Sequence, residues 1–235
     1  MKRHFRIIAC LILCIASTAH AVPPVSVKAT YDVYKSNLRL GQISESYTRN
    51  NDHYTLISTT RAVGLLAIFQ RGKISIKSTG MVSDQGLKPL HFSDMRNSEE
   101  AKNHRAEFDW NAMKLTLTEQ SKNTVVALLD GTQDRLSAMY QFMFLSWGQS
   151  DTLGFNMTNG SKLDSYNYRV TPNQHVTVPL GTFKALYLTS TPETDAGKTE
   201  IWLATEHHYF PYKMIITDRD GDKLTQVLTK IDFVP

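Results

Sequence analysis

Cysteine is nearly absent from this sequence, which contains only Cys10 and Cys14, both within its first 21 residues. The rest of the chain has no thiol to form a disulfide, to act as a nucleophile or to ligate a metal. We therefore expect a fold that its core alone stabilises. The lack of disulfides fits a bacterial periplasmic protein better than a small eukaryotic secreted domain.

Long apolar runs are also missing. The longest, residues 7–16, is about half of the ~20 residues that a membrane-spanning helix needs. It follows a basic start at residues 1–6 and precedes the small-x-small sequence Ala-His-Ala at residues 19–21. These three parts predict a secretory signal peptide cleaved after Ala21, a periplasmic protein that begins at Val22, and no transmembrane segment after cleavage.

The chain has little net charge to recruit a partner. It carries 26 Lys and Arg against 22 Asp and Glu, and Lys2, Arg3 and Arg6 lie in the predicted signal peptide. No basic cluster with interleaved aromatic residues occurs. The sequence therefore predicts no nucleic-acid partner.

What the chain has instead is an alternation of apolar and polar residues, interrupted at short intervals by turn residues, from about residue 27 onward. This pattern is typical of antiparallel strands. We predict strands at residues 27–35, 38–49, 53–61, 73–83, 90–96, 103–110, 113–119, 166–171, 175–178, 182–190, 198–205, 212–218 and 223–233, with a turn at 84–89.

One segment has helical spacing instead. Residues 134–147 predict the principal α-helix, with Thr132 or Asp134 as N-cap and Gly148 as terminator. Its apolar positions at helical spacing are Leu136, Met139, Tyr140, Met143 and Trp147. Phe142 and its neighbours widen this stripe until little polar face remains, which indicates a buried helix.

Several later strands are apolar on both faces, as in residues 183–188. Two covered faces predict a mainly β protein built as a strongly curved antiparallel sheet or an open β-barrel around one principal α-helix, at about residues 134–147. No repeat or linker divides the chain, so we expect a single domain over residues 22–235.

Short motifs in a characteristic order run along most of the chain. They are residues 31–34, Gly41, 54–56, 64–65, 86–89, 134–137, 178–183, 200–203 and 211–221. In these motifs the chain resembles the bacterial periplasmic family known as domain of unknown function 3108. The resemblance implies an antiparallel, β-rich envelope protein with no established reaction, and it transfers no catalytic residue.

Two segments, one acidic and one with adjacent histidines, have residue types that can bind metal ions. Asp218 to Asp222 has alternating carboxylates, but its glycine is fourth and Thr229 stands at the twelfth position, where a calcium loop needs Glu. We interpret it as a hairpin turn. His207 and His208 would point to opposite faces of a strand. We therefore predict no metal site and no cofactor.

The sequence contains no Gly-x-Ser-x-Gly motif, and we assign no catalytic residue. A carboxylate pair would carry no short motif, so a hydrolase acting on envelope polymers stays open as one hypothesis.

Two apolar segments could line a pocket for an acyl chain. Their residues are Leu65, Leu66, Ile68, Phe69, Met139, Phe142, Met143 and Trp147. The alternative is that they only fill the core. Our leading hypothesis is a non-enzymatic periplasmic protein that binds a lipid or acyl chain inside its curved sheet. The other is an assembly or interaction factor with a filled core and an envelope protein as its partner.

Overall fold

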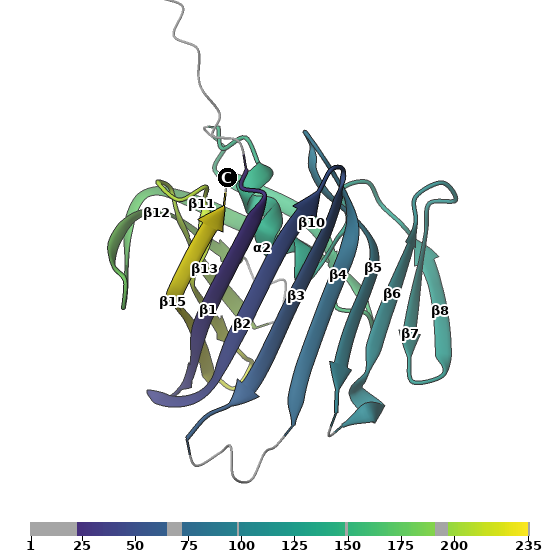
Figure 1. The fold of residues 1–235 in the computed structure, drawn as a ribbon, viewed down its shortest axis with the longest axis horizontal. Coiled ribbons are helices and arrows are strands. Elements are labelled where there is room, and N and C mark those ends of the chain that lie inside the picture. The colour runs from purple at the N-terminus through teal and green to yellow at the C-terminus, as the bar shows by residue number, and fades with distance from the viewer. Residues whose placement is uncertain (1–22, 65–71, 98, 149, 191–196, 235) are drawn as a thin grey trace, which may run out of the picture.

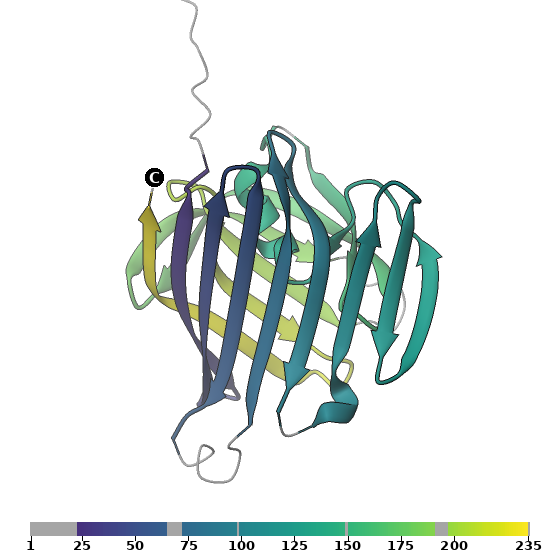
Figure 2. The same ribbon diagram turned by 45° about the vertical axis from the view of Figure 1, so that its right-hand side comes forward.

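The protein folds mainly as β-structure around a short helical segment. The computed structural model describes residues 23–64, 72–97, 99–148, 150–190 and 197–234. Within these ranges, fifteen strands belong to one sheet. The sheet curves strongly, so that strands of its N-terminal half lie on one side of the helix and strands of its C-terminal half on the other (Figures 1 and 2).

Two meanders build the sheet, each in chain order. The first contains β1 (Ser26–Lys35), β2 (Leu38–Asn50), β3 (His53–Ala62), β4 (Lys73–Ser83), β5 (Gly86–Arg96), β6 (His104–Asp109), β7 (Lys114–Glu119) and β8 (Lys122–Ala127). The second contains β9 (Gln133–Asp134), β10 (Thr152–Thr158), β11 (Leu163–Val178), β12 (Gly181–Ser190), β13 (Lys198–Ala204), β14 (Phe210–Thr217) and β15 (Lys223–Val234). A 3-10 turn, η1 (Glu100–Lys102), precedes β6.

The meanders are joined at the middle of the sheet, where β1 pairs with β15. Every pairing in the sheet is antiparallel except that of β9 with β10. The alternation in β1 is clear, since Val27, Ala29, Tyr31 and Val33 are all buried. The first three form the main core with residues of β2–β5, β11–β15 and the helical segment.

The helical segment is shorter than predicted. The expected α-helix at about 134–147 is α2 (Ser137–Gln141) followed by a 3-10 turn, η2 (Phe142–Phe144). Asp134 belongs to β9, but its carboxylate accepts hydrogen bonds from the Leu136 and Ser137 amides at the helix start. The helix stops early because Leu145 is extended and the Trp147 indole N–H bonds the Phe142 carbonyl. Aromatic packing overrides the helical period here.

The β9–α2 segment is fastened to β5 on the inner side of the sheet. Gln133 donates to the Leu87 carbonyl at 2.8 Å, and Gln141 accepts from the Leu87 amide at 2.7 Å. The β10–β11 turn packs on β5 and β6, since a Cβ at Gly160 would lie 2.8 Å from the His104 Cβ. In the described residues no ladder of hydrogen bonds joins β8 to β9, so the sheet stays open.

Several strand predictions need correction. The strands expected at 166–171 and 175–178 are one long strand, β11, whose register shift between Thr171 and Gln174 accommodates Pro172. β5 already begins at Gly86, so the turn is shorter than expected. The short or polar strands β8, β9 and β10 were not predicted. The prediction of two covered faces holds, because Ala185 and Leu188 of β12 are both buried, in different clusters.

Candidate functional site

The inward face of the sheet has a packed region and a half-buried region. In the packed region, Tyr47, Tyr140 and Phe210 are fully buried. Tyr140 of α2 stacks on Tyr47 at 5.7 Å and meets Phe210 edge-on at 5.4 Å between ring centroids. This is a filled core with no space for a ligand.

The half-buried region follows on the same inward faces. We define it by Ile43 of β2, Ile76 of β4, Met139 of α2 and Met214 of β14, all of which keep part of their surface accessible. Ile43 and Ile76 pack against the main core, and Met214 against a second cluster; Met139 touches both. The sheet therefore leaves apolar surface uncovered on its inner side.

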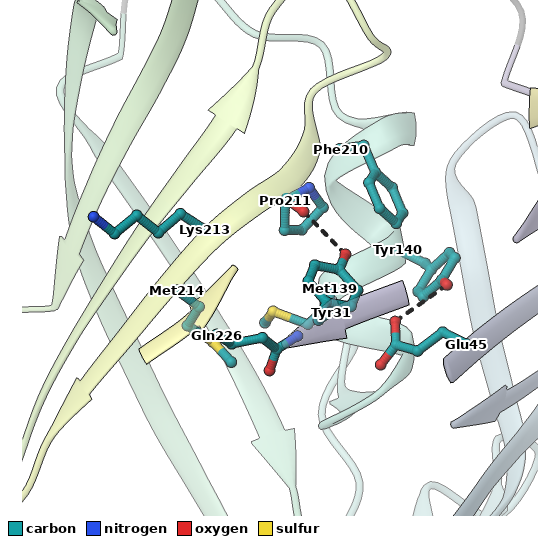
Figure 3. A pocket seen from close by; sticks show the side chains of 9 residues that line it. All are labelled: Tyr31, Glu45, Met139, Tyr140, Phe210, Pro211, Lys213, Met214 and Gln226. Carbon is teal, nitrogen blue, oxygen red and sulfur yellow. Dashed lines mark hydrogen bonds between the residues drawn. The ribbon is translucent and has the colours of Figure 1, made fainter. Parts of the chain in front are cut away.

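A small cavity lies between the two regions, where β14 and β15 separate (Figure 3). The two strands pair only between Lys213–Thr217 and Lys223–Val227, and β15 then continues beside β1. The cavity has a volume of about 20 Å³, enough for about one water molecule. Its walls are mainly apolar, with the Glu45 carboxylate among them; the lining residues are Tyr31, Glu45, Met139, Tyr140, Phe210, Pro211, Lys213, Met214 and Gln226.

Glu45 connects the helix to the sheet. Its carboxylate accepts hydrogen bonds from the Tyr140 hydroxyl at 3.2 Å and the Ser58 hydroxyl at 3.0 Å. Burial raises the pKa of Glu45 to about 7, although both hydrogen bonds act to lower it. A carboxyl group with this pKa changes its charge near neutral pH.

A second buried acid anchors the start of α2. Asp134 is fully buried and accepts a 2.5 Å hydrogen bond from Ser78, whose hydroxyl lies 3.0 Å from that of Tyr54. Burial raises the pKa of Asp134, opposed by its hydrogen bonds with Ser78 and with the helix start. All these contacts are satisfied, so we interpret this network as structural.

A third polar group is incompletely satisfied. Asp94 of β5 is buried and forms ion pairs through its Oδ2 with Arg135 at 2.8 Å and with Arg96 at 3.6 Å. Among the residues that the structure describes, its Oδ1 has no hydrogen-bond partner, and neither has the Nε of either arginine or the Nδ1 of His104. Burial lowers the pKa of Arg135, with the charge of Asp94 acting in the opposite direction.

A separate cleft lies between η2 and β10. Its volume is about 270 Å³, a little below the ~300 Å³ typical of the smallest ligand sites. Its lining includes Phe142, Leu145, Leu153 and Phe155. The α2–η2 segment thus has hollows on two sides, with Met139 at the small cavity and Phe142 at the cleft.

The predicted pocket residues that the structure describes have different surroundings. Leu65, Leu66, Ile68 and Phe69 lie outside the described residues. Of the helical residues, Met139 and Phe142 line different hollows, Met143 is buried in the main core, and Trp147 packs on Phe142 and Tyr209. The sequence reading missed the inward-facing charges of Glu45, Asp94 and Arg135. Only for Glu45 does the sequence carry a signal, because this residue alternates with Ile43 and Tyr47.

The acidic segment at 218–222 is a turn between β14 and β15. The Asp218 carboxylate accepts hydrogen bonds from the Asp220 and Asp222 amides, and Gly221 has a φ of 85°. His207 and His208 lie in a turn rather than on a strand, which corrects the expected geometry. Over the described ranges, no three His, Cys, Asp or Glu side chains are grouped to hold a metal ion.

In the part of the chain that the structure describes, none of the helices has the length and apolar character needed to cross a bilayer.

The fold defines an open, β-barrel-like protein. A crystal structure titled as a β-barrel-like protein of domain of unknown function DUF1849 from Brucella abortus is similar, with a TM-score of 0.61 and 14% sequence identity. The match covers 92% of this chain and 100% of that one. The family described as protein of unknown function DUF3108 matches residues 30–229, so the chain belongs to that family, as its motifs predicted. No curated protein matches the chain.

Proposed function

We propose that this protein is a non-enzymatic, periplasmic binding protein that takes a lipid or acyl chain on the inner side of its curved sheet. The half-buried region carries the proposal, because it leaves Ile43, Ile76, Met139 and Met214 partly accessible within an otherwise packed interior. A ligand that covered this surface would gain about 25 cal/mol for each Å² of apolar area buried. Methionine side chains adapt readily to irregular apolar ligands.

The periplasmic location rests on the first 21 residues, with their basic start, short apolar run and small-x-small site. Cell fractionation with N-terminal sequencing should recover the protein in the periplasm with Val22 as its first residue. Recovery of the uncleaved chain in the inner membrane would contradict this location.

Binding is tested with a fluorescent fatty acid titrated into the purified protein. Replacing Met139 with Trp should fill the space beside Met214 and weaken binding at least 10-fold, while the far-ultraviolet circular dichroism stays that of the wild type. Met113→Trp is the matched control, since Met113 lies exposed in the β6–β7 turn. This variant should bind the probe as the wild type does.

Leu145→Trp distinguishes the two hollows. Leu145 lines the cleft between η2 and β10 but not the small cavity at Glu45. We expect this variant to bind the probe normally. Loss of binding in Leu145→Trp together with normal binding in Met139→Trp would move the ligand to the cleft. No binding to the wild type at all would reject the carrier function.

The open edge of β8 favours a second candidate function, an envelope assembly or interaction factor. β8 pairs only with β7 in the described residues, and Val125 is 58% exposed. An extended segment of a partner could add to such an edge. A photo-crosslinker at position 125 should then capture a periplasmic protein in cells, whereas one at Ile57, exposed on β3 but away from any edge, should not. Equal capture at both positions would count against edge pairing.

A further inference from the structure

A row of inward-facing residues connects the half-buried region to the incompletely satisfied ion pair. Across β2 to β6, the register aligns Glu45 with Ser58, Ser58 with Ile76, Ile76 with Asp94 and Asp94 with His104. Neighbouring strands lie about 4.8 Å apart, so Ile76 is directly beside Asp94. Glu45 is three strands from Asp94, which corresponds to roughly 14 Å. Apolar surface and ionic groups therefore adjoin on one face.

Two arginines share one carboxylate oxygen in this cluster. Arg135 reaches Asp94 from the β9–α2 junction and Arg96 reaches it from the end of β5. Two further acids are near. The buried Asp134 acts on the charge of the adjacent Arg135, and Glu99 lies 3.9 Å from Arg96 but closer to Lys102, at 3.0 Å. On the β6 side, His104 faces Glu119 at 4.0 Å. Asp94 thus serves two guanidinium groups with one oxygen, and both acidic contacts of Arg96 are longer than a hydrogen bond.

The arginines also keep unused hydrogen-bonding capacity. Within the described residues, the Nε of each is buried without a hydrogen-bond partner, although buried polar groups are almost always hydrogen-bonded. A ligand cannot reach these Nε atoms, but the side chains as a whole are 27% and 33% exposed, for Arg96 and Arg135 respectively, so it can approach the exposed part of each. A guanidinium group forms two parallel hydrogen bonds with a carboxylate or a phosphate.

We propose that Arg96 and Arg135 bind the anionic head group, carboxylate or phosphate, of an amphipathic ligand whose chain lies along Ile76 and Met139. This proposal rests on the proposed function and narrows its ligand to acidic lipids. Asp94 is a positioning residue, because it holds both guanidinium groups at one point. The alternative is a purely structural role, in which the ion pairs only hold the β9–α2 segment against β5; we call this role the clamp.

The test compares three probes of equal chain length: hexadecanoic acid, hexadecyl phosphate and hexadecanol. The wild type should bind both acids about 10- to 100-fold more tightly than the alcohol, as expected for charge-assisted hydrogen bonds worth about 1.5–3 kcal/mol. Arg96→Gln removes the 3.6 Å contact to Asp94 and the 3.9 Å contact to Glu99 but keeps the shorter Arg135–Asp94 ion pair. It should abolish this preference and leave the affinity for hexadecanol unchanged. Arg39→Gln is the matched control, since Arg39 pairs with Asp32 on β1 and is 42% exposed.

The outcomes separate the two proposals. No binding of any probe to the wild type rejects the proposed function itself. Equal binding of acids and alcohol, or an unchanged preference in Arg96→Gln, keeps the carrier function and overturns the anionic head group. Inorganic phosphate is titrated as well. If phosphate alone binds as tightly as hexadecyl phosphate, the cluster takes a free anion and the head-group proposal fails.

Arg135→Gln breaks the 2.8 Å ion pair and tests the clamp directly. The structural role alone would lower stability without changing the ratio of acid to alcohol affinities. We expect that ratio to fall in this variant too, measured under conditions where circular dichroism shows it folded. Asp94→Asn keeps the shape of the side chain but loses the charge that holds both guanidinium groups, so where folded it should lower the ratio of acid to alcohol affinities; an unchanged ratio would contradict the positioning role.

Discussion

The packed and half-buried regions lie on the same inward faces of the same strands, yet they differ in what completes them. Around Tyr140, side chains of the helix and both meanders meet and exclude water. Around Met139, one position earlier in the helix, the side chains keep accessible surface. The difference shows that α2 fills only part of the space that the curved sheet encloses.

The first prediction is that substitutions in the two regions change the free energy of unfolding by different amounts. Phe210→Ala in the packed region should cost about 3–5 kcal/mol, because a fully buried ring leaves a cavity. Met214→Ala in the half-buried region should cost no more than about 2 kcal/mol, because less of its surface is removed from water. Urea unfolding of both variants checks the contrast. Equal losses would mean that both positions are core.

The second prediction concerns pH at the boundary between the two regions. The folded protein holds the pKa of Glu45 at about 7, above the ~4.3 of an unfolded chain. The folded state therefore binds the extra proton, and this contribution to stability is complete below about pH 4 and is lost as the pH rises to 7. We expect a loss of roughly 2–3 kcal/mol over this window, allowing for partial exposure.

Thermal unfolding between pH 4 and 8 measures this effect, with Glu45→Gln as its comparison. The glutamine keeps the hydrogen bonds and cannot ionise, so its stability should vary less with pH over the same window. The interpretation of Glu45 would be wrong if the two proteins showed the same dependence.

The third prediction tests the hydrogen-bonded anchor of α2. Ser78→Ala removes one donor to the buried Asp134 carboxylate and the partner of the Tyr54 hydroxyl. Leaving these groups unsatisfied should cost about 1–3 kcal/mol in urea unfolding. Ser75→Ala, at a half-buried position on the opposite face of β4, should stay within about 0.5 kcal/mol of the wild type.

The smallest expected effect is at the turn between β14 and β15. The Asp218 carboxylate is occupied by backbone amides, so millimolar calcium or a chelator should leave the melting temperature unchanged. A specific calcium site at 100 times its dissociation constant would add about 2.7 kcal/mol. A calcium-dependent rise in melting temperature would therefore reject the turn interpretation.

Local patterns in the sequence determine most of this fold. The alternation that buries Val27 and Tyr31 predicts β1, and the aromatic stripe predicts that α2 is buried. β8 could not be predicted, because its residues are exposed on both faces and carry no alternation. β9 has two residues, and only its contact with β10 makes it a strand. Tertiary contacts also decide where the helix ends.

The candidate site was harder to predict because its parts come from distant strands. Inward-facing positions can be recognised in one strand, as for Glu45 between Ile43 and Tyr47. That Asp94 meets Arg135, 41 residues away, depends on how the sheet curves back over β5. A single sequence does not encode that curvature in any short pattern, so the ion pair appears only in the folded structure.

The pairing of β1 with β15 has a consequence for the order of folding. Each meander can form from neighbouring hairpins, with little loop entropy to overcome. The two meanders can pair only after both have been made, because β1 is the first strand in chain order and β15 the last. In the periplasmic protein that we propose, a chain exported in extended form would therefore keep its two halves apart until β15 has crossed the membrane.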